Sequence, residues 1–213
     1  HQNSFMKQFS TVMLFALFLA SCNDSDSIKE EGKRENNHAG HTMISSGADY
    51  CDSINSGLIA ADTLKGSPHR TAMNTIAGTH VHIEYSSPGV KDRVIWGGLV
   101  AWDKVWVAGA HQATSIRFYK DVLIDGKTIP AGTYAFFAIP GKDKWTLLLN
   151  RNYDQHLADD YRESEDIIRL SVEPSKNATT QRLTYVVESV KEKQGVVNLM
   201  WENIKVGLPF KVI

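Results

Sequence analysis

Hydrophobic and polar positions change pattern twice along this chain. An apolar run from Val12 to Leu19 is followed, from Asn23 to about Ala48, by a polar stretch with almost no apolar periodicity. From about Ser67 onward, short apolar or alternating runs are separated by turn residues. That last pattern is typical of β-strands joined by close turns. We therefore expect a leader, a polar segment and one β-rich domain.

Three stretches carry the clearest strand signals. Val81, Ile83 and Tyr85 alternate with polar neighbours, so these three side chains should enter the core from one strand. The pair Asp125-Gly126 separates two short apolar runs and predicts a tight hairpin. Residues 133–139 are apolar on both faces, which predicts a central strand. Further strands are predicted at 105–107, 115–119, 145–149, 167–172, 183–188, 196–201 and 204–212.

Eight to ten short strands with little helix predict an all-β fold. We expect a single β-sandwich or jelly-roll-like domain with one or two short helices, around residues 53–61 and 154–161.

The N-terminal run resembles a bacterial lipoprotein signal. Lys7 precedes the apolar run, and Leu19-Ala20-Ser21-Cys22 resembles a lipobox, in which Cys22 would be acylated. The predicted organisation is a signal segment at 1–21, a flexible polar tether at 22–48 and the β-sandwich domain at 49–213. Lipid on Cys22 would hold the protein at a membrane, expected to be the outer membrane, facing the periplasm or the cell surface. An ordinary secretory signal is the alternative.

The composition and charge of the chain bear on which classes of partner it binds. The chain has 42% hydrophobic residues, 22% charged residues and a net charge of −1, without a cluster of Lys and Arg. Nucleic acid is therefore not an expected partner. Cys51 is the one cysteine besides Cys22, so the core rather than a disulfide should stabilise the domain.

A group of histidines raises the possibility of metal chemistry. His80, His82 and Glu84 should leave one face of a strand together, and His111 is the candidate third ligand from a later strand. Three histidines on zinc or copper would support a metal-dependent hydrolase or lyase, with Glu84 as a general base or a partner of the ligands. The alternative is an ordinary half-solvated strand.

The polar segment holds a second set of soft ligands. His38, His41 and Met43 could bind copper or zinc in a metal-handling role at the cell envelope. The alternative is a polar linker with incidental histidines.

A ligand site is predicted among the glycine-rich bends. The candidate binding residues are Arg93, Trp96, Trp106 and Thr114, because tryptophans and arginine beside such bends suit a carbohydrate or an anionic envelope ligand. Packing of the tryptophans in the core or at its rim is the alternative. The common nucleophile-elbow, P-loop and dinucleotide motifs do not occur in the sequence.

Several motifs in order resemble one family. "HVHIEYSSPGVKDRVIWGGLV", "VWVAGAHQATSIRF", "IDGKTIPAGTYAFFAIPG" and "WTLLLN" are similar to an uncharacterised family of exported bacterial proteins (DUF 2911), over roughly Ser67 to Ile213. The resemblance implies a lipoprotein but no reaction. Many members have Gly-Ala-Asn-Glu-Ala-Thr where this chain has residues 109–114, and they lack the His-x-His pair. The expected role is a membrane-anchored binding or accessory module of the envelope, with the metal-dependent enzyme and metal handling as alternatives.

Overall fold

The structure is a computed structural model that describes residues 46–213. The predicted signal segment, Cys22 and the ligand set of His38, His41 and Met43 lie outside these residues, so those predictions remain predictions. The elements are α1 (Ser46–Asn55), β1 (His69–Ile76), β2 (Thr79–Ser86), β3 (Ser115–Phe118), β4 (Val122–Ile124), β5 (Lys127–Ile129), β6 (Gly132–Ile139), β7 (Trp145–Asn150), the 3-10 turn η1 (Glu163–Glu165), β8 (Asp166–Val172), β9 (Ser175–Lys191) and β10 (Gln194–Val212).

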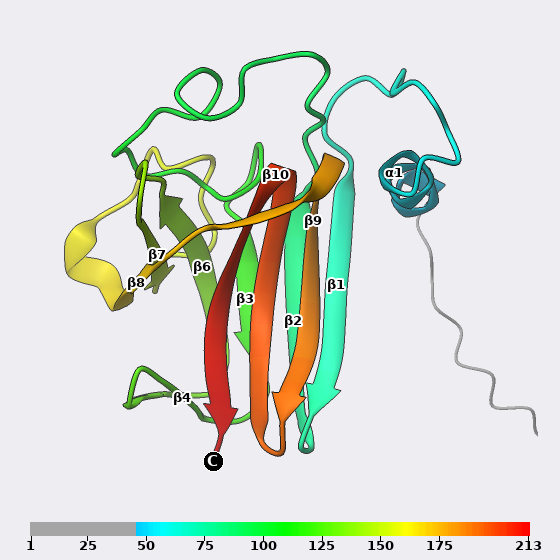
Figure 1. The fold of residues 1–213 in the computed structure, drawn as a ribbon. Helices are drawn as coiled ribbons and strands as arrows, with labels where there is room; N and C mark the ends of the chain where they lie inside the picture. Colours follow the sequence, from blue (N-terminus) through cyan, green and yellow to red (C-terminus); the bar gives the residue numbers. More distant parts are fainter. Residues whose placement is uncertain (1–45) are drawn as a thin grey trace, which may run out of the picture. The chain divides into compact units, whose positions relative to one another are not determined.

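The strands form two antiparallel sheets (Figure 1). One sheet has the strand order β1-β2-β3-β6-β7-β8 and the other has the order β5-β4-β10-β9. A single large apolar cluster draws on both sheets, with Ile83 from β2, Phe136 from β6 and Leu199 from β10. The described residues are therefore a sandwich-like all-β domain, as the sequence predicts.

The alternation in β2 assigns its two faces. Val81, Ile83 and Tyr85 are buried in the core between the sheets. His82 is partly buried and Glu84 is exposed on the opposite, outer face. The prediction for this strand is confirmed because a strand has a side-chain period of two.

Two other local predictions are confirmed. β4 and β5 form the expected hairpin, in which Asp125 and Gly126 have positive φ angles of 50° and 75°. Such angles match the tight turns that twist with their strands. β6 lies between β3 and β7 and has five consecutive buried residues, as a central strand covered on both faces should.

Other strands differ from the prediction. The runs at 196–201 and 204–212 belong to one long strand, β10, whose pairing with β9 is irregular around Glu202. A bulge at Glu202, where φ is 54°, interrupts the pattern without ending the strand. Residues 105–107 contribute only an isolated bridge between Trp106 and Ala138. β1 was not predicted, because only Arg70 and Ile76 are buried on this edge strand.

The helices also differ. α1 overlaps the predicted helix at 53–61 only in its last residues, and 154–161 forms turns and bends instead of a helix. Cys51 of α1 is fully buried, with the Ser87 Oγ 3.8 Å from its Sγ. Among residues 46–213, the structure has no helix long and apolar enough to cross a membrane.

A buried arginine connects the segment before β1 to β9. The Arg182 guanidinium is fully buried, donates to Asp62 Oδ1 (2.7 Å) and to the carbonyl of Gly66 (2.8 Å), and places its Nε 2.6 Å from Asp62 Oδ2. The Asn55 side chain accepts from the Arg182 backbone N–H (2.7 Å) and donates to its carbonyl (2.9 Å). We call this set of contacts the Arg182 clamp. It satisfies a buried charge with a carboxylate and carbonyls, which burial of a charge requires.

The outer face of the six-stranded sheet has two halves. On β6 and β7 the outward residues Ala135, Phe137 and Leu148 are buried in a second apolar cluster. Val107, Ala113 and partly buried residues up to Tyr161 pack on them from the loops after β2 and β7. We call this the covered half. On β1, β2 and β3 the outward side chains are polar except for Met73, and all but Ser86 are at least partly accessible. We call this the open half.

Candidate functional site

The open half holds a groove of about 560 Å³, which we call the sheet-face groove. Its floor is the outer face of β2 and β3, and loop residues from the edge of the covered half form one side. The residues that line it are His69, His82, Glu84, Tyr85, Ser86, Gln112, Ala113, Ser115, Arg117, Tyr119, Thr133, Tyr153 and Asp154. The volume falls within the range of about 300–1,000 Å³ that is usual for small-molecule sites.

One carboxylate in the groove contacts two imidazoles. Glu84 Oε1 lies 3.3 Å from His82 Nε2, and Glu84 Oε2 lies 3.8 Å from His69 Nε2. The antiparallel pairing of β1 with β2 brings His69 to this end of the strand, opposite Ser86. His69, His82 and Glu84 thus place hydrogen-bond donors and acceptors in a defined arrangement on the groove floor.

Aromatic rings stand beside these polar groups. The Arg117 guanidinium carbon lies 4.5 Å from the centroid of the Tyr119 ring, a cation–π distance. His80 meets the same ring edge-on at a centroid distance of 5.0 Å. The Tyr119 and Tyr153 side chains are 48% and 49% exposed, so parts of both rings remain free to contact a ligand. The groove thus combines hydrogen-bonding groups of both kinds with accessible aromatic surface.

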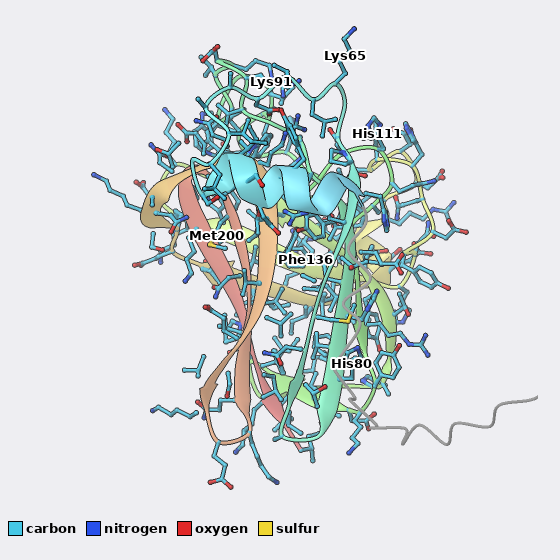
Figure 2. The ribbon with its side chains drawn as sticks, turned by 90° about the vertical axis from the view of Figure 1, so that its right-hand side faces the viewer. Lys65, His80, Lys91, His111, Phe136 and Met200 are labelled. Atoms are coloured by element: carbon cyan, nitrogen blue, oxygen red, sulfur yellow. The ribbon has the colours of Figure 1, made fainter. Side chains whose placement is uncertain are left out.

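The predicted three-histidine site is not formed. Ser115 pairs with Glu84 and Arg117 pairs with His82, so the antiparallel register carries the residues before Ser115 away from His80. Figure 2 shows His111 among the loops at one end of the sandwich and His80 far from it along the sheet. Within residues 46–213, no group of three or more His, Cys, Asp and Glu side chains is arranged to hold a metal ion.

Two of the predicted ligand-binding residues meet His111 in a second cavity. The long loop between β2 and β3 arches over one end of the sandwich (Figure 1) and helps to enclose about 330 Å³, which we call the loop pocket. Arg93, Trp106 and His111 all line it. The full lining is Ser67, Pro88, Arg93, Leu99, Val100, Trp106, Val107, Gly109, Ala110, His111, Leu157 and Trp201.

The other two predicted residues have structural contacts. The Trp96 indole donates to Glu202 Oε2 (2.9 Å) and packs edge-on against Trp145. Thr114 is fully buried, and its hydroxyl donates to the Ala108 carbonyl (3.1 Å). Neither residue lines the loop pocket, so the alternative of core packing describes Trp96 better than ligand binding does.

Two tyrosines, one buried and one partly buried, hydrogen-bond to other segments of the chain. The Tyr185 hydroxyl donates to the Ala108 carbonyl (2.6 Å), and complete burial raises the pKa of Tyr185 well above its ordinary value. In the covered half, Tyr161 donates to Asp166 Oδ2 (2.6 Å). Burial first, and then the hydrogen bond and charge of Asp166, raise the pKa of Tyr161 to about 12. Both hydroxyls are therefore neutral hydrogen-bond donors over the physiological range.

Sequence reasoning missed several groove residues. The alternation of Ile116 and Phe118 with Arg117 and Tyr119 gave a usable signal, because it places the last two on the outer face. Their proximity to His82 depends on the pairing of β3 with β2, which the alternation does not specify. Tyr153 comes from an irregular loop and had no such signal.

Comparison with known proteins gives one match. The model of the family described as "Protein of unknown function (DUF2911)" matches residues 67–210, which include all but the end of the last strand of the two sheets and all the lining residues of both cavities. No curated protein and no solved structure matches the chain.

Proposed function

The chain belongs to this family of proteins of unknown function, and we propose that it is a carbohydrate-binding module of the bacterial cell envelope. The sheet-face groove is the binding site. The observation that carries this proposal is the combination of Tyr119 and Tyr153 rings with hydrogen-bonding side chains on one open sheet face.

The chemistry of the groove suits a polyhydroxylated ligand. A sugar hydroxyl both donates and accepts hydrogen bonds, and the groove offers donors such as Arg117 together with acceptors such as Glu84 and Asp154. The less polar face of a sugar ring can lie against a tyrosine, whose body is apolar and whose hydroxyl is polar. The lining contains side chains of both charges, which favours a neutral or zwitterionic ligand over a strongly charged one.

The rigidity of the floor supports recognition. His82, Glu84, Ser115 and Arg117 all project from paired strands, and sites on regular elements hold their side chains more accurately than loops do. The contact of Glu84 with His82 further limits the freedom of both side chains before a ligand arrives.

The lipobox-like segment supports a location at the membrane. Acylation of Cys22 would anchor the module, and the polar segment that follows would separate the lipid from the binding groove. In this proposal the protein faces the periplasm or the cell surface, where envelope polysaccharides are its ligands.

The proposal is tested by screening the purified protein on a glycan array and measuring the best ligand by titration calorimetry. Arg117→Ala and Tyr119→Ala should each weaken binding by at least about tenfold, because each removes a central contact. Arg162→Ala, at an exposed arginine outside the groove, should leave the affinity unchanged. A ligand bound equally well by both groove variants would overturn the proposal.

A further inference from the structure

The loop pocket has a chemistry distinct from that of the groove. Its walls are mainly apolar, with the Trp106 ring stacked on Trp201 at a centroid distance of 5.8 Å and an interplanar angle of 18°. Arg93 and His111 are its basic side chains, and none of its lining residues is acidic. An apolar cavity with a few convergent polar groups is the usual form of a small-molecule site.

Arg93 is held in position yet keeps hydrogen-bonding capacity. Its Nε donates to the Val90 carbonyl (3.2 Å), and one terminal nitrogen donates to the Gly89 carbonyl. No carboxylate pairs with Arg93 among the ion pairs of residues 46–213, and nearby Asp62 is engaged by the buried Arg182. The free N–H groups of this planar fork match the two oxygens of a carboxylate.

The rim of the pocket is held in an uncommon backbone conformation. His111 and Leu157, which line the pocket, have positive φ angles of 62° and 52°, and the buried Ala108 between two lining residues has a φ of 51°, although none of them is glycine. The Leu157 N–H donates to the His111 carbonyl (2.7 Å), which ties the two sides of this rim together. Such conformations cost free energy and persist where the surrounding contacts determine them, often at binding sites.

We propose that the loop pocket binds a small carboxylate that has an aromatic or apolar body. The Arg93 fork holds the carboxylate, and His111 supplies a further donor at the rim. The body lies against Trp106 and the apolar wall. The pocket volume of about 330 Å³ suits a ligand built on a single ring. This site is separate from the sheet-face groove, with which it shares no lining residue.

The test follows tryptophan fluorescence of the full chain during titration with benzoate. Saturable quenching is expected, because the ligand body lies beside Trp106. Benzamide has nearly the same shape without the charge and should bind at least about tenfold more weakly, since it loses the charge-assisted pair with Arg93. Inorganic phosphate, which has no apolar body, should not give saturable quenching in the millimolar range.

Matched variants locate the site. Arg93→Gln should weaken benzoate by at least about tenfold, whereas Arg162→Gln should not change its affinity. His111→Asn keeps a residue that tolerates positive φ and should reduce affinity several-fold by removing the imidazole. The comparison of benzoate with benzamide on the unaltered protein needs no variant, so it decides the matter even where a variant fails to fold.

Three results would overturn the inference. They are the absence of saturable benzoate binding up to about 10 mM, equal affinity for benzamide, and undiminished benzoate binding by a folded Arg93→Gln variant. Arg117→Ala should leave benzoate binding intact, so failure of the carbohydrate proposal and failure of this one give different results.

Discussion

The covered half and the open half belong to one face of one sheet, yet one is core and the other is the surface that we propose binds a ligand. Their difference lies in the outward positions of neighbouring strands. These positions carry Ala135, Phe137 and Leu148 in the covered half, and His82 and Arg117 in the open half. The loops cover the strands whose outward side chains are apolar and stop where the polar side chains begin.

The physical reason is the balance between burial and hydration. Removing apolar surface from water stabilises the folded state by about 25 cal/mol per Å², so burial of Phe137 under the loops is favourable. The same loops would have to strip water from Arg117 and Glu84, which costs free energy unless new partners are supplied. The loops therefore end at the border between the two halves, where loop residues such as Tyr153 form one side of the groove.

The largest expected effect comes from breaking the covered half. Phe137 is fully buried, with Tyr161 edge-on at a centroid distance of 5.4 Å. Phe137→Ala should lower the free energy of unfolding by about 3–5 kcal/mol, through lost burial and the cavity left behind. Urea denaturation measures this change. Met73→Ala is the control, because Met73 is exposed on β1, on the same outer face of the six-stranded sheet. It should lower the free energy of unfolding by less than about 0.5 kcal/mol.

A smaller effect comes from the tyrosine that pins the covering loop. The pKa of Tyr161 is raised to about 12 from its ordinary value of 10.0, so its stabilising contribution is complete below pH 10 and is lost as the pH rises towards 12. Tyr161→Phe removes the hydrogen bond to Asp166 and should cost about 1–2 kcal/mol at neutral pH.

Denaturation of the protein and of Tyr161→Phe at pH 8, 10 and 12 tests this expectation. The stability difference between the two should shrink across the upper interval, because the unaltered protein alone loses the contribution of this hydroxyl. A difference that stays constant up to pH 12 would show that Tyr161 does not titrate as expected.

The smallest expected effect on stability comes from the open half. Arg117→Ala should change the free energy of unfolding by less than about 0.5 kcal/mol, because Arg117 is exposed and stacks only on a half-exposed ring. The same substitution should weaken the proposed ligand binding at the groove by at least about tenfold. Stability loss comparable to that of Phe137→Ala would contradict the division of this face into a structural half and a binding half.

The elements that the sequence predicts correctly are those with a local pattern of hydrophobic, polar and turn residues. Alternation assigned β2 and its two faces, the Asp125-Gly126 pair assigned a hairpin, and the continuous apolar run at 133–139 assigned the central strand. These signals depend on a strand's own residues and need no partner. β1 was not predicted, because this edge strand is mostly exposed and its residues show little alternation of apolar and polar side chains.

The site was less predictable because it depends on pairing. The sequence placed His82 and Glu84 on one outer face, and the structure agrees. It could not say that β3 would bring Arg117 beside His82, or that the same register would carry His111 away. The sequence pattern predicts a metal site for His111 and a ligand site for Arg93 and Trp106. The loop after β2 brings all three residues into one pocket.

The Arg182 clamp has a mechanical consequence for a protein held at its N-terminal side. Tension transmitted from Cys22, as proposed, would enter the domain at α1 and reach the bonds of Asn55 and Asp62 to Arg182 before it reached β1. Those bonds join the incoming chain to β9, the long edge strand of the smaller sheet that pairs along its length with β10, so the load would bypass β1 at the edge of the larger sheet. Force on the N-terminal side would therefore not separate β1 from β2 directly. The proposed binding face on β2 and β3 would stay folded under that force.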